Sequence, residues 1–164
     1  MIDLYLSLGS NMGDRAANIS EAIKRLEKSF GVGLERASHV IETESWGFDA
    51  PDFLNCAVLF SLPRKRQSAE SQALEILSVV KGIEKEMGRK ETLEYDIDGN
   101  RMYHSRTIDI DILYFGRHRI DLPQLQIPHP LITEREFVMI PLLEIAKSSL
   151  KRAFPVLLKG EAGQ

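Results

Sequence analysis

Two aspartates separated by one residue are the side chains in this sequence most suited to metal chemistry. Asp109 and Asp111 lie in the stretch 106–112, where polar and apolar residues alternate strictly, which predicts a strand with one apolar face. A strand rises about 3.3 Å per residue, so the two carboxylates would lie about 6.6 Å apart on one face. At an effective dielectric constant of about 20 their repulsion would be about 2.5 kcal/mol. A hard divalent cation such as Mg²⁺, which binds carboxylate oxygen and commonly brings phosphate with it, would remove that cost.

A structural interpretation of the same pair stays open. The two aspartates could lie on an exposed strand face, solvated or paired with lysine. The neighbouring sequence favours function, because Arg106 precedes the pair and Ile127-Pro128-His129-Pro130 and Arg135 follow it. A site for a cation and an anionic ligand needs this mixture of acidic and basic groups.

The elements that must position these residues follow from the hydrophobic pattern. Strands are expected at 2–8, within 34–43, at 53–62, at the aspartate stretch, and at 120–122. Helices are expected from Asp14 to Gly31, over 68–87 and over 134–146, the second with an inner stripe of Leu74, Leu77, Val80, Ile83 and Met87. The order of strands and helices predicts an α+β sandwich, a mostly antiparallel sheet covered by helices.

Length and composition limit the class of protein. At 164 residues the chain is expected to form a single domain over 1–164, and its net charge of -3 offers no basic surface for nucleic acid. The single cysteine, Cys56, lies in an apolar run, which indicates a buried thiol and suits a reducing cytoplasm. No signal peptide and no run long enough to span a bilayer is seen, so we expect a cytoplasmic location and no membrane partner.

Asn55 is the polar exception in the apolar run 53–62. A buried amide must find hydrogen-bond partners, and asparagine can offer both donors and acceptors to a heterocyclic ligand. The alternative is an asparagine that holds a neighbouring loop. Taken alone, the residue favours that alternative.

Several motifs in the same order resemble the 6-hydroxymethyl-7,8-dihydropterin pyrophosphokinase family of folate biosynthesis over nearly the whole chain. They are Leu8-Gly9-Ser10-Asn11, Phe53-Leu54-Asn55-Cys56-Ala57, Ile83-Glu84 with Gly88-Arg89, Arg106-Thr107-Ile108-Asp109-Ile110-Asp111-Ile112-Leu113, Ile127-Pro128-His129-Pro130, Arg135-Glu136-Phe137, and Pro141-Leu142 with Glu144-Ile145-Ala146. Each motif alone is weakly specific, whereas the set is strongly specific.

The resemblance implies a ferredoxin-like enzyme that transfers pyrophosphate from ATP to the hydroxymethyl group of the pterin and releases AMP. By that likeness Asp109 and Asp111 bind two Mg²⁺ ions and, with Arg89 and Arg106, form the catalytic set. ATP contacts are implied for Lys81, Glu84, Arg89, Arg106, Ile112, His129 and Arg135. Pterin contacts are implied for Thr43, Trp46, Phe53, Asn55 and Phe137, with the two phenylalanines on either side of the ring.

Some positions depart from the family pattern. Glu91 stands where a second arginine is often found, Tyr103 stands where a tryptophan is common, and Glu44-Ser45-Trp46 replaces a common proline pair. The loop between Arg89 and Arg106 is also longer than in compact members, and we expect it to be mobile. We expect a monomer with small-molecule substrates. The rival hypotheses are a ferredoxin-like RNA-binding module, which the acidic strand disfavours, and an inactive pterin- or nucleotide-binding protein.

Overall fold

The structure, a computed structural model, describes residues 1–44, 52–88, 98 and 107–158. Its strands are β1 (Ile2–Ser10), β2 (Arg36–Ala37), β3 (Ile41–Thr43), β4 (Phe53–Leu62), β5 (Asp109–Phe115), β6 (Ile120–Leu122) and β7 (Leu125–Ile127). Its α-helices are α1 (Arg15–Phe30), α2 (Ala69–Glu86), α3 (Glu136–Ile145) and α4 (Ser148–Ala153), with a 3-10 turn at Ile132–Glu134.

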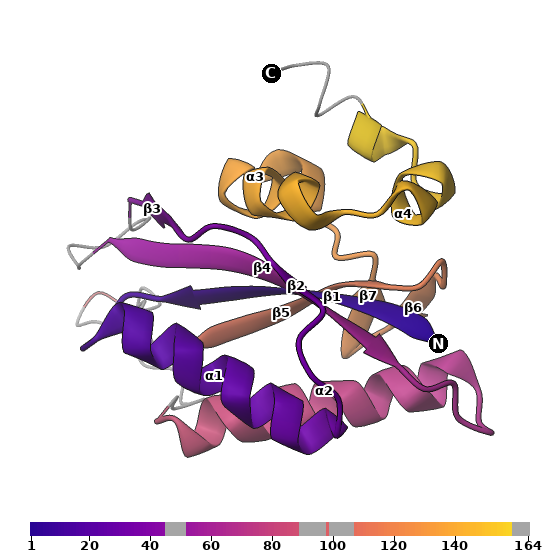
Figure 1. The fold of residues 1–164 in the computed structure, drawn as a ribbon, viewed down its shortest axis with the longest axis horizontal. Coiled ribbons are helices and arrows are strands. Elements are labelled where there is room, and N and C mark those ends of the chain that lie inside the picture. The colour runs from indigo at the N-terminus through magenta and orange to yellow at the C-terminus, as the bar shows by residue number, and fades with distance from the viewer. Residues whose placement is uncertain (45–51, 89–97, 99–106, 159–164) are drawn as a thin grey trace.

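The main sheet is antiparallel, with strand order β2-β4-β1-β5 and with β3 also paired to β4. Helix α1 follows β1 and helix α2 follows β4, which is the connectivity of the ferredoxin-like sandwich. In Figure 1, α1 and α2 cover one face of the sheet and α3 and α4 lie over the other. The expected α+β sandwich is therefore confirmed.

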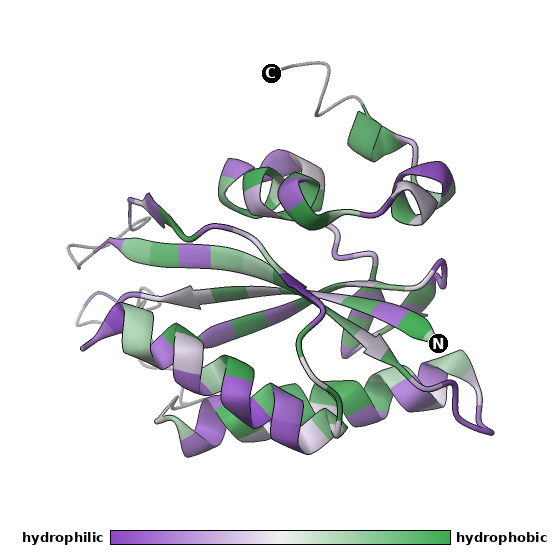
Figure 2. Ribbon diagram, in the orientation of Figure 1, coloured by the Kyte–Doolittle hydropathy of each residue, from purple (hydrophilic) through white to green (hydrophobic). Residues whose placement is uncertain are grey.

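Burial of the sheet on both faces produces two hydrophobic cores. Leu4, Leu6 and Leu8 of β1 pack with the inner sides of α1 and α2, whereas Tyr5 packs with residues of α3 and α4. The alternation in β1 suggested a polar second face, yet Tyr5 is 0% exposed. The difference arises because α3 covers that face; Figure 2 shows the hydrophobic green of the strands continuing between the two helical layers.

The first part of β5 follows the predicted alternation and its second part does not. Ile110 and Ile112 are buried in the core beneath α1 and α2, while Asp109 and Asp111 lie on the opposite face. Residue 113 is an extra residue in the pairing with β1, because Tyr5 faces Tyr114 and Leu6 faces Ile112. This β-bulge turns Leu113 towards α3 and ends the alternation.

The two long helices begin at side-chain caps, at the positions where the sequence predicted the helices to start. The Asp14 carboxylate accepts a hydrogen bond from the Ala17 amide at 3.1 Å, and the Ser68 hydroxyl accepts one from the Ser71 amide at 3.1 Å. Helix α1 ends at Gly31, whose φ of 69° is the left-handed conformation that glycine adopts easily.

The inner face of α2 is wider than the predicted stripe. Val80 and Ile83 are buried as expected, whereas Leu74, Leu77 and Met87 are only partly buried at the edge of the core. Ala73 and Ile76 are also buried. The reason is that α2 packs against both α1 and β5, so a broader face of the helix lies in the core. Helix α4 was not expected from the sequence, and its six residues show too little periodicity to predict it.

Two expectations drawn from composition can be compared with the structure. Cys56 is 2% exposed, and burial raises the pKa of its thiol to about 12, so it is a structural thiol as expected. In the described part of the chain, none of the helices combines the length and the apolar character that crossing a membrane requires.

Candidate functional site

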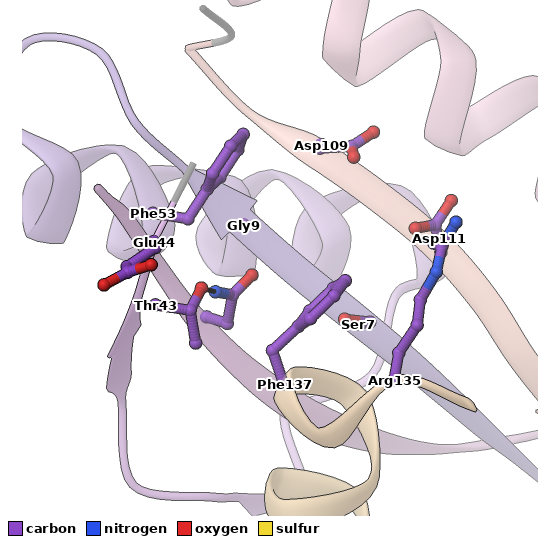
Figure 3. A pocket seen from close by; sticks show the side chains of 10 residues that line it. Ser7, Gly9, Thr43, Glu44, Phe53, Asp109, Asp111, Arg135 and Phe137 are labelled. Carbon is purple, nitrogen blue, oxygen red and sulfur yellow. Dashed lines mark hydrogen bonds between the residues drawn. The ribbon is translucent and has the colours of Figure 1, made fainter. Parts of the chain in front are cut away.

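A pocket of about 120 Å³ opens on the α3 face of the sheet, at the end where β1 finishes and β5 begins. Its walls come from β1, β3, β4, β5 and the start of α3, so segments from the whole chain meet there (Figure 3). The lining residues are Ser7, Gly9, Thr43, Glu44, Phe53, Asn55, Asp109, Asp111, Arg135 and Phe137.

The floor of this pocket is set by the register of the central strands. Gly9 of β1 lies between Asp109 on β5 and Asn55 on β4, and Ser7 lies between Asp111 and Ala57. β1 therefore contributes small residues at the centre, while β5 contributes the two carboxylates and β4 contributes the Asn55 amide. This arrangement creates a hollow bordered by carboxylates at one edge and an amide at the other.

The carboxylate edge is formed by Asp109 and Asp111, which are both half-buried. Figure 3 shows both side chains extending from the same face of β5 and the Arg135 side chain reaching from the start of α3 towards Asp111. The donor set is two hard carboxylates beside a guanidinium. Mg²⁺ is commonly bound by one or two carboxylates with water and phosphate as its other ligands, so this set fits Mg²⁺ and an anionic ligand together.

The amide edge is formed by Asn55, which is 5% exposed and whose orientation is fixed by a neighbour. Its Nδ2 donates a hydrogen bond to Oγ1 of Thr43 on β3 at 2.6 Å. On its other side, a Cβ atom placed on Gly9 would lie 2.9 Å from Asn55 Oδ1. Thr43 and Gly9 therefore hold the amide in one direction, which is what recognition of a polar ligand edge requires.

Replacing Gly9 with alanine tests this packing. We expect Gly9→Ala to raise the Kd for the pocket's ligand by about tenfold, because the new methyl displaces Asn55 and costs about one hydrogen bond, with little change in folding. Calorimetric titration with the hydroxymethyl pterin that the sequence leads us to expect measures the effect.

Gly82 on α2 is the matched control, since a Cβ atom there meets nothing within 4 Å. Gly82→Ala is expected to stabilise the helix by about 1 kcal/mol and to leave binding unchanged. Unchanged binding in Gly9→Ala would show that Asn55 needs no such support.

The aromatic part of the pocket consists of Phe53 from β4 and Phe137 from α3, both partly buried and both projecting into the hollow in Figure 3. The Arg135 guanidinium lies over the Phe137 ring, with 5.7 Å from Cζ to the centroid, which helps to hold both side chains at the rim. Flat aromatic faces beside a fixed amide suit a planar heterocycle.

A second pocket of about 430 Å³ adjoins the first and shares Asp111 with it. Its lining residues are Leu77, Lys81, Ile110, Asp111, Ile112, Pro123, Gln124, Leu125, Gln126, His129 and Pro130. The second pocket thus combines an apolar part with two basic side chains, Lys81 and His129. Two adjacent pockets that meet at a carboxylate can hold two substrates with their reacting groups close together.

His129 has a fixed tautomer, because its Nδ1 accepts a hydrogen bond from the Leu131 amide at 3.2 Å. The proton of the neutral ring is then on Nε2, which can donate to a phosphate oxygen. Burial and the nearby Arg135 lower the pKa of His129, against an opposing effect of Asp109.

A pH dependence of stability follows from this shift. As pH falls below about 6.5, the unfolded chain binds a proton that folded His129 resists, so the free energy of unfolding falls by at most about 1.4 kcal/mol per pH unit. We expect His129→Asn, whose Oδ1 can still accept from Leu131, to lose less stability than the unchanged protein between pH 7 and pH 5. Urea unfolding between pH 7 and pH 5, without Mg²⁺, measures this difference in stability. If the free energy of unfolding depends on pH in the same way in both proteins, His129 is not the source of the pH dependence.

The structure brings most of the sequence-predicted site residues to the two pockets. Thr43, Phe53, Asn55, Asp109, Asp111, Arg135 and Phe137 line the first, and Lys81, Asp111, Ile112 and His129 line the second. Glu84 lines neither pocket: it is 1% exposed, and its Oε2 accepts a hydrogen bond from the Ile110 amide at 3.0 Å. Trp46, Arg89, Glu91, Tyr103, Arg106 and the loop between Arg89 and Arg106 lie outside the described residues.

Three residues that line the first pocket were not singled out as site residues from the sequence, namely Ser7, Gly9 and Glu44. The available signal was Gly9 near the end of an apolar strand, where glycine often marks a close approach of a ligand or another chain. Ser7 gives no such signal, because serine at that place in an alternating strand is ordinary.

Comparison with known proteins identifies a family that this chain matches over most of its length. The family model for 7,8-dihydro-6-hydroxymethylpterin-pyrophosphokinase matches residues 5–147. A 2-amino-4-hydroxy-6-hydroxymethyldihydropteridine pyrophosphokinase of Porphyromonas gingivalis is 38% identical over 148 residues, which is 89% of this chain and 92% of that protein. The enzyme of the same name from Aquifex aeolicus is 39% identical, over 88% of this chain and 81% of that protein.

Longer proteins also contain a matching region. A folate synthesis bifunctional protein of Arabidopsis thaliana is 41% identical over 87% of this chain and 27% of its own length. A solved structure described as an HPPK-DHPS in complex with substrates superposes with a TM-score of 0.56 at 12% identity, over 99% of this chain and 44% of that one. At that identity, the superposition supports the fold alone.

Proposed function

This chain belongs to the 7,8-dihydro-6-hydroxymethylpterin-pyrophosphokinase family, and on that premise we propose that it transfers pyrophosphate from ATP to 6-hydroxymethyl-7,8-dihydropterin and releases AMP. The observation that carries the proposal is the meeting of two pockets at Asp111. One pocket has aromatic rings and a fixed amide for a flat heterocycle. The other has an apolar part and basic groups for a nucleotide.

The first pocket is proposed to hold the pterin. Phe53 and Phe137 would lie against the ring faces, while Asn55 and Thr43 would bind its polar edge, with Trp46 supplying a further contact. Asn55 is buried and already oriented by Thr43, so a ligand with the wrong polar edge would leave buried groups without partners. This arrangement supports selection of a pterin over an apolar ring of the same shape.

The second pocket is proposed to hold ATP, with its triphosphate directed to the carboxylate pair. Lys81, His129 and Arg135 would neutralise phosphate charge, Ile112 would contact the nucleotide, and Arg89 and Arg106 complete the proposed catalytic set. Transfer reactions of this type depend on positioning and charge neutralisation more than on covalent chemistry by the protein. We therefore assign no side chain as a general base.

Asp109 and Asp111 are proposed to bind two Mg²⁺ ions. When bound, Mg²⁺ supplies charge neutralisation for the triphosphate and lowers the pKa of an oxygen that it contacts. The half-buried pair on one strand face would keep the bound ions at the border between the two pockets, where the nucleotide and the accepting hydroxyl meet. The proposal extends to a single pyrophosphokinase domain over 1–164, acting as a cytoplasmic monomer without nucleic-acid or membrane partners.

The test is to mix the protein with ATP, Mg²⁺ and the hydroxymethyl pterin and to measure AMP. We expect AMP in amounts equal to the pyrophosphorylated pterin, and we expect EDTA to stop its release. No AMP above a control without protein would overturn the proposal. Tight binding of the pterin without AMP would instead identify an inactive binding protein.

A further inference from the structure

Glu84 of α2 is almost completely buried although it lines neither pocket. Its Oε2 accepts a hydrogen bond from the backbone amide of Ile110 at 3.0 Å, and Ile110 is the residue between Asp109 and Asp111. We propose that Glu84 is a positioning residue that fixes the separation of the two metal-binding carboxylates by holding the strand between them. This inference rests on the proposed function, because it assigns Mg²⁺ to that pair.

The place of β5 in the sheet explains why the strand needs this support. β5 is the last strand in the order β2-β4-β1-β5, so within the described part of the chain it pairs in the main sheet with β1 alone. In an antiparallel pair, successive residues direct their backbone groups alternately towards the partner and away from it. The Ile110 amide binds Glu84, so it faces away from β1, and the backbones of Asp109 and Asp111 face Gly9 and Ser7.

Segment 109–111 is consequently held from two directions. β1 holds the backbone of each aspartate, and Glu84 holds the residue between them from the side of β5 that faces away from β1. Without an acceptor there, the Ile110 amide would lose its partner inside the protein, and the edge strand could move to find water. Such movement would change the distance between the carboxylates to which Mg²⁺ must bind.

The charge of Glu84 is balanced locally. Lys81 Nζ lies 3.7 Å from Glu84 Oε1, and the Lys81 side chain is half exposed where it lines the second pocket. Burial of a carboxylate is costly unless it is paired and hydrogen-bonded, and here both conditions are met. The position therefore carries a group that can accept strongly from a backbone amide, which an apolar side chain cannot do.

Glu84→Gln and Glu84→Met separate positioning from charge. The glutamine oxygen can still accept from Ile110, whereas methionine has a similar shape and no comparable acceptor. We expect Glu84→Met to raise the Mg²⁺ concentration for half-maximal AMP release by about tenfold and to lower kcat by about tenfold, since supports of metal ligands typically contribute this much. Glu84→Gln should stay within about threefold of the unchanged protein, and neither variant should change the KM for the pterin.

Native-state hydrogen exchange supplies a readout independent of activity. The Ile110 amide should lose protection in Glu84→Met and keep it in Glu84→Gln, while the Asp109 and Asp111 amides stay protected in both. Glu75→Met, on the exposed side of the same helix, is the control and should change nothing in the site.

Two results would overturn the inference. One is an unchanged Mg²⁺ dependence in Glu84→Met. The other is equal damage in the glutamine and methionine variants, confined to the KM for ATP, which would assign Glu84 to direct nucleotide binding through its charge. A failure of the proposed function would look different from both of these results. The protein without substitutions would then release no AMP, while the Ile110 amide would still lose its exchange protection in Glu84→Met and keep it in Glu84→Gln.

Discussion

Asp109→Asn and Asp111→Asn are each expected to lower the rate of AMP release by about a thousandfold without weakening the fold. Metal ions stabilise the charge of a transferring group by several kcal/mol, and about 4 kcal/mol corresponds to that factor. Removing one of two like charges also relieves a repulsion of at most about 2.5 kcal/mol in the metal-free protein. Activity should therefore fall without a matching loss of stability, which is not the pattern of a purely structural residue.

The measurements are AMP release with saturating substrates and urea unfolding without Mg²⁺. Asp121→Asn on β6 is the matched control, because Asp121 is an exposed strand aspartate whose Oδ1 accepts a long hydrogen bond, 3.4 Å, from Gln126 Nε2. It should change neither quantity by much. Loss of stability in Asp109→Asn or Asp111→Asn, with activity lost in proportion, would mean that the pair is structural.

The sequence predicted those parts of the fold that depend on local pattern. The capping residue Asp14 and the apolar stripes predicted where α1 and α2 run, because capping and periodicity act within a few residues. The burial of Tyr5 was not predictable in this way. The face of β1 that carries Tyr5 is covered by the α3–α4 region. There the Lys147 amide, 142 residues along the chain, donates a hydrogen bond to the Tyr5 hydroxyl at 3.1 Å.

The candidate site also contains residues that the local sequence predicts and residues whose role depends on distant contacts. Asp109, Asp111 and Asn55 could be singled out because charged or amide side chains are unusual in apolar strands and need a reason to be there. Gly9 contributes by having no side chain, and that matters only once the register places it between Asp109 and Asn55. The support from Glu84 is equally invisible in the sequence, because its partner is a backbone amide 26 residues away.

Asn55→Leu is expected to lower kcat/KM for the pterin by about a hundredfold or more, with the KM for ATP unchanged. Leucine has nearly the same shape, so the pocket should keep its form while the polar edge of the ligand loses its partner. Each buried polar group left without a partner costs about 1–3 kcal/mol, and the amide can serve the ligand as donor and acceptor. Thr43 would also lose the donor at 2.6 Å that now holds its hydroxyl.

A second buried amide provides the comparison that separates recognition from folding. Gln72 of α2 is 4% exposed, its Nε2 donates to the Pro63 carbonyl at 3.0 Å, and it lines neither of the two pockets. Gln72→Met should cost stability and leave the KM for the pterin as it was, whereas Asn55→Leu should change the KM for the pterin and cost less stability. If both variants lose stability equally and bind the pterin normally, Asn55 holds the β3–β4 connection in place and the ring is read by other groups. Thr43→Val tests whether the Asn55 amide must be held in one orientation for the ligand. If it must, this substitution should lower kcat/KM for the pterin by about tenfold.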